Sequence, residues 1–282
     1  MFLYNWYIDP LYLWVFVITL VISIATQAYL RSTYGKWSHT KNSAGLNGIQ
    51  VGKRIIQQTR LGVLSQADSA PVETPELIIL ADMRDKGIVT ADEFNAKKAQ
   101  IQQKQQDVVV SRIKLAQTPG QMTDHYDPRS HTVRASEGVA TQPSVASMAI
   151  MAHELGHAQQ HENNSVLISM RNFLIPAVNF ASPLSYICIF MGFLFNLSGL
   201  VGLGILFFAI MVLFTLVTLP VEFDASRRGL KLLDQSGLMR TEADTKGSQQ
   251  VLRAAALTYV AAAVTAVLQL LYYLRLAGRR RR

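Results

Sequence analysis

The chain has 282 residues, half of them hydrophobic and only 16% charged, which favours an integral membrane protein with a soluble domain and several spans. Its formal net charge of +8 does not indicate nucleic-acid binding, because the basic residues are scattered apart from Arg279 to Arg282, which directly follow an apolar segment. The sole cysteine, Cys188, excludes disulfide bonds and thiolate zinc sites within one chain, so any metal must bind to histidines and carboxylates.

Residues 11–30 form a continuous apolar segment of about the 20 residues that a membrane-spanning helix needs. A cleaved signal peptide would carry positive charge before this segment, whereas the only charged side chain there is that of Asp9. We therefore expect a retained membrane anchor over residues 1–30. Aromatic residues near its start predict an interfacial belt: Tyr4, Trp6, Tyr7, Tyr12 and Trp14.

Basic residues directly after this anchor predict its orientation. Arg31, Lys36 and Lys41 follow the apolar segment, and the positive-inside rule places such residues in the cytoplasm. We therefore expect a multi-pass protein in the lipid bilayer of the inner cell membrane, with its catalytic site on the cytoplasmic side.

Residues 74–106 predict a separate helical unit after a short helix at 48–64 and a linker at 65–74. One helix is expected over residues 75–85, and the capping-box pattern from Thr90 to Glu93 opens a second helix that ends near residue 106. This segment, with KGIVTADEF as its most specific part, resembles a SHOCT module, a short helical hairpin found in many bacterial proteins. The resemblance implies self-association or a protein partner; the alternative is a solvated insertion without a site.

Residues 107–142 predict a small β hairpin. A first strand is expected from Val108 to Leu115, a turn at 124–130 and a second strand at 131–136. Such a hairpin before a metal-binding helix is typical of zinc peptidases, in which an edge strand can pair with an extended substrate.

Three residues of this hairpin could hydrogen-bond a reacting carbonyl group: His125, Tyr126 and His131. Taken singly, each residue is more often a turn or surface residue. The cluster DHYDP, which contains the first two, is a stronger indication than any one of them.

Residues 144–161 predict a helix that carries the H-E-x-x-H pattern from His153 to His157. Positions four apart share one face of a helix, so the two imidazole rings can bind one metal ion while Glu154 lies beside them, within reach of a metal-bound water. The alternative is a coincidence on an ordinary helix. Other parts of a metal site, at positions that the topology requires, weaken that alternative.

Two further spans are expected at 175–195 and 200–219, separated by a turn at 196–199. Two crossings return the chain to the side that it left. Glu222 is the first acidic residue after this transmembrane hairpin (175–220), and we predict it as the third zinc ligand. Asp224 either orients a ligand imidazole or forms an i,i+4 pair with Arg228.

The last apolar helix, at about 251–276, conflicts with the charge rule. If it crosses the membrane, its terminal arginines lie on the side opposite the site. Three interpretations remain open: the helix lies in the membrane plane, it folds back, or the whole orientation is inverted.

Four motifs in this order resemble the YugP-like family of neutral membrane zinc metallopeptidases: DHYDP, AHELGHAQQH, VTLPVEFDASRR and VLRAAALTYVAAA. The resemblance covers nearly everything except about residues 65–107. It implies a zinc peptidase of the gluzincin kind, broadly similar to HtpX-type membrane proteases, with His153 and His157 as zinc ligands and Glu154 as the catalytic residue. It also supports Glu222 as the third ligand.

We therefore expect a mainly α integral membrane protein with a gluzincin-like domain, a small β hairpin and three to four transmembrane helices. The zinc-peptidase domain is expected at 31–73 and 107–174, interrupted by the SHOCT-like insertion. A return helix with the third ligand (221–250) and a C-terminal apolar helix with its basic tail (251–282) complete the chain.

The expected activity is hydrolysis of peptide bonds in proteins, including membrane proteins. Zn²⁺ activates a water molecule, Glu154 acts as general base, and His125 or Tyr126 helps to stabilise the oxyanion. The alternative is a non-catalytic membrane scaffold with a structural or vestigial zinc site and SHOCT-mediated protein interactions.

Overall fold

The computed structural model describes residues 10–62, 75–106 and 111–280. Within these residues the helices are α1 (Pro10–Ser38), α2 (Gly48–Thr59), α3 (Pro75–Asp85), α4 (Ala91–Gln106), α5 (Glu137–Thr141), α6 (Val145–Glu162), α7 (Val166–Leu194), α8 (Ser198–Gln235) and α9 (Glu242–Arg280). The strands are β1 (Lys114–Thr118), β2 (His125–Asp127) and β3 (Thr132–Ser136).

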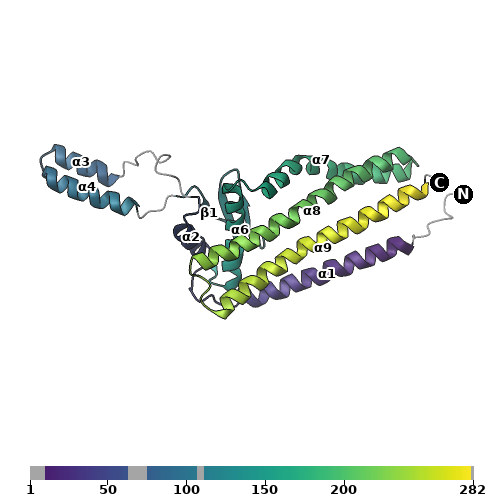
Figure 1. Cartoon of the computed structure of the whole chain (residues 1–282), viewed down its shortest axis with the longest axis horizontal. Helices are drawn as coiled ribbons and strands as arrows, with labels where there is room; N and C mark the ends of the chain where they lie inside the picture. Colours follow the sequence, from purple (N-terminus) through teal and green to yellow (C-terminus); the bar gives the residue numbers. More distant parts are fainter. Residues whose placement is uncertain (1–9, 63–74, 107–110, 281–282) are drawn as a thin grey trace.

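Four long helices form an elongated bundle, with a compact domain at one end of it (Figure 1). By length and composition α1, α7, α8 and α9 are each able to cross a membrane. These four helices and the small sheet confirm the predicted fold class, a mainly helical membrane protein. The compact domain contains α2, α5, α6 and the three strands.

α8 differs from the expected span followed by a separate return helix. It runs for 38 residues without interruption, and Pro220 lies inside it. A proline removes one backbone hydrogen bond but does not have to end a helix whose neighbours support it. Glu222 is therefore carried on the same helix that spans the bundle.

α9 runs beside α1 and α8 toward the end of the bundle that is remote from the compact domain (Figure 1). The helix neither folds back nor crosses its neighbours. Its basic end and the start of α1 thus lie at the same end of the bundle. The conflict with the charge rule remains, and the membrane orientation stays a prediction.

The sheet differs from the predicted hairpin. Its strand order is β1-β3-β2; β1 pairs with β3 in parallel, and β2 pairs with β3 antiparallel. The hairpin is thus β2–β3, and His125 to Asp127, expected in a turn, form a strand. Asp127 fixes the turn that follows, because its carboxylate accepts hydrogen bonds from the backbone N–H of Arg129 and the hydroxyl of Ser130, at 3.0 and 2.7 Å.

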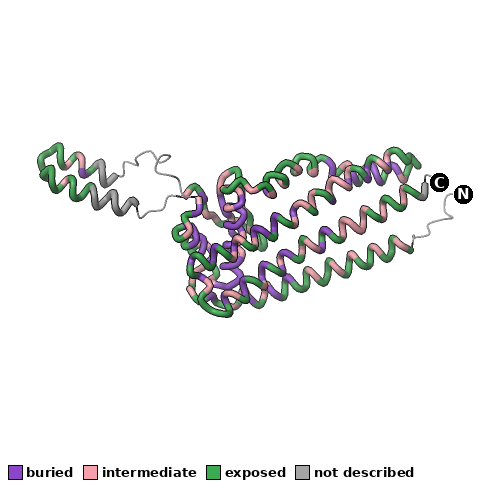
Figure 2. The backbone as a smooth tube through the Cα atoms, viewed as in Figure 1, coloured by how far each residue is buried: buried purple, intermediate pink, exposed green. Residues whose placement is uncertain are grey.

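α6 lies at the centre of the core. Figure 2 shows that buried residues concentrate in the compact domain, whereas the long helices have largely exposed faces. Met148, Met151 and Leu155 of α6 are fully buried. α8 approaches α6 closely because Gly156 of α6 has no side chain where the backbone of α8 passes: a Cβ on Gly156 would overlap the carbonyl of Ala225. This close approach brings the side chains of α8 to the H-E-x-x-H face.

The predicted helical hairpin is present as α3 and α4, which pack on each other. Its capping box is complete: the backbone N–H of Thr90 donates to Oε2 of Glu93, at 3.0 Å, and the backbone N–H of Glu93 donates to Oγ1 of Thr90, at 3.3 Å.

Several predicted features lie outside the described residues. They are the aromatic residues Tyr4, Trp6 and Tyr7, the linker at 65–74, the start of the predicted first strand at 108–110, and the last two arginines.

Candidate metal centre

Two histidines of α6 and one carboxylate of α8 converge in the compact domain. Nε2 of His153 and Nε2 of His157 lie 3.4 and 3.5 Å from Oε2 of Glu222. One ligand atom from each of the three residues lies within 4.8 Å of the others. Ligands bound at about 2.0–2.1 Å in a tetrahedral zinc site are roughly 3.4 Å apart, so the observed separations suit a shared ion.

The environment of Glu222 supports the same conclusion. The residue is only 2% exposed, and its Oε2 atom is buried without a hydrogen-bond partner. A buried carboxylate oxygen without a hydrogen bond is costly, and a cation between it and the two imidazoles would remove that cost. Two imidazole nitrogens and one carboxylate oxygen form a donor set that suits Zn²⁺.

Gln160 fixes the orientation of the His157 ring. Its amide Nε2 donates to the backbone carbonyl of Val221 and to Oδ2 of Asp224, both at 2.9 Å. The amide oxygen therefore faces Nδ1 of His157, 3.1 Å away, and accepts a hydrogen bond from the Nδ1–H group. With the proton on Nδ1, the lone pair of Nε2 is available to a metal ion.

His153 has a similar partner, since its Nδ1 lies 3.2 Å from the hydroxyl of Ser226 on α8. Asp224 combines the two interpretations that the sequence left open. It pairs with Arg228, whose Nε lies 2.6 Å from Oδ2, and it also acts on His157 through Gln160. Neither Gln160 nor Ser226 was identified from the sequence, because their roles depend on which faces of α6 and α8 meet.

The two carboxylates near His157 shift its protonation. Burial alone lowers the pKa of His157, but Glu222 and Glu154 together raise this pKa above its ordinary value overall. A proton would therefore compete with a metal ion for this ring more strongly than for an ordinary imidazole.

A cavity of about 200 Å³ lies beside this cluster, between α1, α6, α9 and the segment before β2. Glu154 and His153 line it together with Tyr259. Much of the remaining lining is apolar and includes Leu30 and Val251. Tyr259 was not identified from the sequence as a site residue, although a polar residue within a long apolar helix is a signal for function.

The structure does not bring His125 and Tyr126 to this cavity. His125 is exposed, and its Nδ1 donates to the carbonyl of Thr123 at 2.8 Å. The hydroxyl of Tyr126 lies 3.3 Å from Nδ1 of His131. Burial, followed by the carboxylates of Glu162 and Asp127, raises the pKa of Tyr126 to about 12. The oxyanion role of His125 and Tyr126 stays a prediction.

Comparisons with known proteins show which family this chain is similar to. The sequence model of a family described as "Putative neutral zinc metallopeptidase" matches residues 90–278. A second one, SHOCT, described as "Short C-terminal domain", matches residues 76–101. The chain is 42% identical over 154 residues to "Putative membrane protease YugP" of Bacillus subtilis (strain 168), covering 55% of this chain and 68% of that relative. No solved structure gave a significant match.

Proposed function

The chain belongs to this neutral zinc metallopeptidase family, whose match covers more than half of it, and from that premise we propose that it is a membrane-embedded endopeptidase of the gluzincin type. The observation that carries the proposal is the buried Oε2 of Glu222, which has no hydrogen-bond partner and faces the Nε2 atoms of His153 and His157.

These three residues would hold zinc, which when bound supplies a Lewis acid for the water and the scissile carbonyl. Glu154 follows His153 on α6 and lines the adjacent cavity. Its carboxylate accepts the proton of the attacking water and then passes that proton to the leaving amine. Gln160 and Ser226 hold the two imidazole rings in place.

Tyr259 is our first choice for the group that hydrogen-bonds the developing oxyanion. It lines the same cavity as Glu154, whereas His125 and Tyr126 do not. A hydroxyl already positioned in a partly apolar cavity stabilises developing negative charge more strongly than one in water. His125 and Tyr126 remain the alternatives derived from the sequence.

The substrates that we propose are unfolded or membrane-inserted protein segments. Two walls of the cavity come from α1 and α9, which are both able to span a membrane, and apolar side chains line much of it. An apolar segment leaving the bilayer would reach Glu154 along these helices. We place the compact domain at the cytoplasmic side of the cell membrane, because Arg31, Lys36 and Lys41 follow the first span.

Replacing Glu154 with Gln tests the assignment. The variant should retain zinc and lose the cleavage of an unfolded membrane protein, because an amide cannot accept the proton of the water. Glu137→Gln changes an exposed carboxylate on α5 and serves as the matched control, with unchanged cleavage.

Undiminished cleavage by Glu154→Gln would refute the role of Glu154. The wild-type activity should also disappear with a chelator and return with Zn²⁺. A non-catalytic scaffold, the second candidate, predicts that the zinc-loaded wild type cleaves nothing at all.

A further inference from the structure

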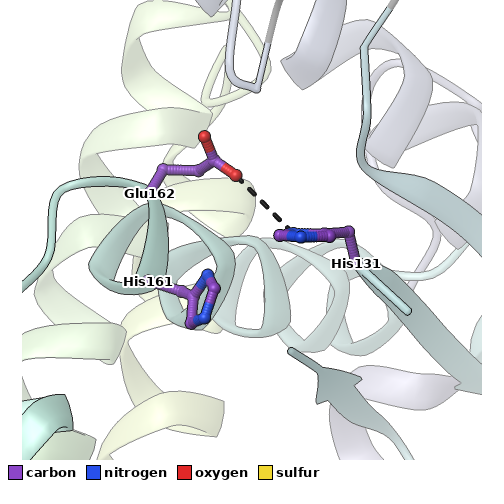
Figure 3. Close-up of side chains that lie close together, drawn as sticks. All are labelled: His131, His161 and Glu162. Carbon is purple, nitrogen blue, oxygen red and sulfur yellow. Dashed lines mark ion pairs between the residues drawn. The ribbon is translucent and has the colours of Figure 1, made fainter. Parts of the chain in front are cut away.

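A second group of potential metal ligands lies at the end of α6. His161 and Glu162 are the last turn of this helix, and His131 belongs to the β2–β3 turn opposite them (Figure 3). One ligand atom from each of the three residues lies within 4.8 Å of the others. Nδ1 of His131 is 3.8 Å from Oε1 of Glu162, and the rings of His131 and His161 have centroids 5.4 Å apart.

The backbone of the β2–β3 turn directs His131 toward α6. His131 has a φ of 48°, a left-handed conformation that glycine adopts at lower cost than histidine. Its carbonyl accepts a hydrogen bond from the backbone N–H of Lys114, at 2.8 Å, which ties the turn to β1. A strained backbone at a residue with a metal-binding side chain is an indication of function.

The charges and the exposure of the surrounding side chains are compatible with a bound cation. Nη2 of Arg112 lies 3.5 Å from Oε2 of Glu162, so the arginine contacts one carboxylate oxygen while Oε1 faces His131. The side chain of Glu162 is 14% exposed and that of His131 is 33% exposed, so an ion could exchange with solvent. The hydroxyl of Tyr126 approaches His131 from the strand side.

We propose that His131, His161 and Glu162 bind a second divalent transition-metal ion, separate from the centre formed by His153, His157 and Glu222. Two imidazoles, one carboxylate and an open position for water suit Zn²⁺ or a similar ion. The site is more exposed than the first, and Arg112 competes for its carboxylate; it therefore binds more weakly.

The second ion would connect the β2–β3 turn to the C-terminal end of α6. Met122 and Asp124, directly before β2, line the cavity beside Glu154, so this connection would stabilise one wall of that cavity. The site also accounts for His131 and Tyr126, sequence candidates that do not line the cavity. The competing interpretation is a simple ion pair between protonated His131 and Glu162.

Metal counting on the full-length protein in detergent tests the proposal. After removal of metal and equilibration with Zn²⁺, the wild type should hold two ions per chain, and His161→Ala should hold one. His39→Ala, which removes an exposed histidine elsewhere, should still hold two. His157→Ala should lose the tighter ion and keep the weaker one.

Two further variants keep the test decisive if His161→Ala folds poorly. Glu162→Gln should also remove only the weaker ion. Arg112→Gln should tighten the binding of the weaker ion about fivefold, because it removes a competing charge. The ion-pair interpretation predicts no such tightening.

A wild type that binds one ion, lost in His157→Ala but retained in His161→Ala and Glu162→Gln, would overturn the second site and leave the proposed function intact. If none of these variants lost zinc, the result would contradict both the second site and the proposed function. Zn²⁺ at concentrations that fill the weaker site should also raise the thermal unfolding temperature of the wild type. The same concentrations should leave the unfolding temperature of Glu162→Gln, which lacks this site, unchanged.

Discussion

Gln160 is completely buried, and its amide connects the two helices that carry the proposed metal ligands. Its oxygen accepts a hydrogen bond from Nδ1–H of His157, while its nitrogen donates to the backbone of α8 and to Asp224. The residue touches no reacting atom in the proposed mechanism, so we regard it as a positioning residue.

Gln160→Ala should therefore weaken zinc binding about 10- to 100-fold, as the loss of a partner that orients a metal-bound imidazole usually does. Competition with a chromophoric chelator would measure the change. Gln142→Ala, at an exposed position after α5, provides the control with unchanged affinity. Equal affinities of the two variants would show that His157 needs no support from Gln160.

Residues of the site differ in how far the sequence could predict them. His153, Glu154 and His157 follow from a local pattern, since spacing along one helix determines which side chains share a face. Glu222 follows from topology, because two consecutive spans return the chain to the same side. Gln160, Ser226 and Tyr259 depend on the contacts among α6, α8 and α9, which no local pattern contains.

Secondary-structure elements also differ in how far the sequence could predict them. The long apolar helices and the α3–α4 hairpin are strongly marked in the sequence by composition and by a capping box. The sheet was predicted less well, because β2 has only three residues and no alternation of apolar and polar side chains. Its order, with β3 in the centre, arises from long-range pairing.

The α3–α4 hairpin is the element for which we propose a protein partner or self-association. It buries Leu80 within its own packing, while Ile79 and Ile88 remain 58% and 62% exposed. Exposed apolar side chains on a small unit are candidates for an interface. Residues 76–101 match the SHOCT family, which confirms the resemblance from which this proposal started.

Changing Ile79 and Ile88 together to Asp should reduce association of the full chain by about tenfold or more and leave its zinc content unchanged, because charge is excluded from an apolar interface. Sedimentation in detergent at several concentrations would measure the association. Lys97→Ala, at an exposed position on α4, is the control. An unchanged mass in the double variant would favour a solvated insertion without a site.

At the scale of the whole molecule, the distribution of basic residues along the bundle predicts its orientation in the membrane. Arg31 and Lys36 lie at the domain end of α1, whereas Arg275 lies near the opposite end of the bundle, on α9. The first span usually dominates the positive-inside rule, although basic residues at the C-terminus are able to reverse it. We therefore expect the compact domain, with Glu154 and its cavity, to face the cytoplasm.

Cysteine labelling of intact cells tests this orientation. In a Cys188→Ser background, a cysteine at Glu137 would report on the compact domain, and one at Gly199, in the first turn of α8, would report on the remote end of the bundle (Figure 1). A membrane-impermeant maleimide should label Gly199→Cys and not Glu137→Cys. Both should react after permeabilisation, which controls for accessibility. The reverse pattern would mean that the terminal arginines determine the orientation and that the proposed peptidase acts outside the cytoplasm.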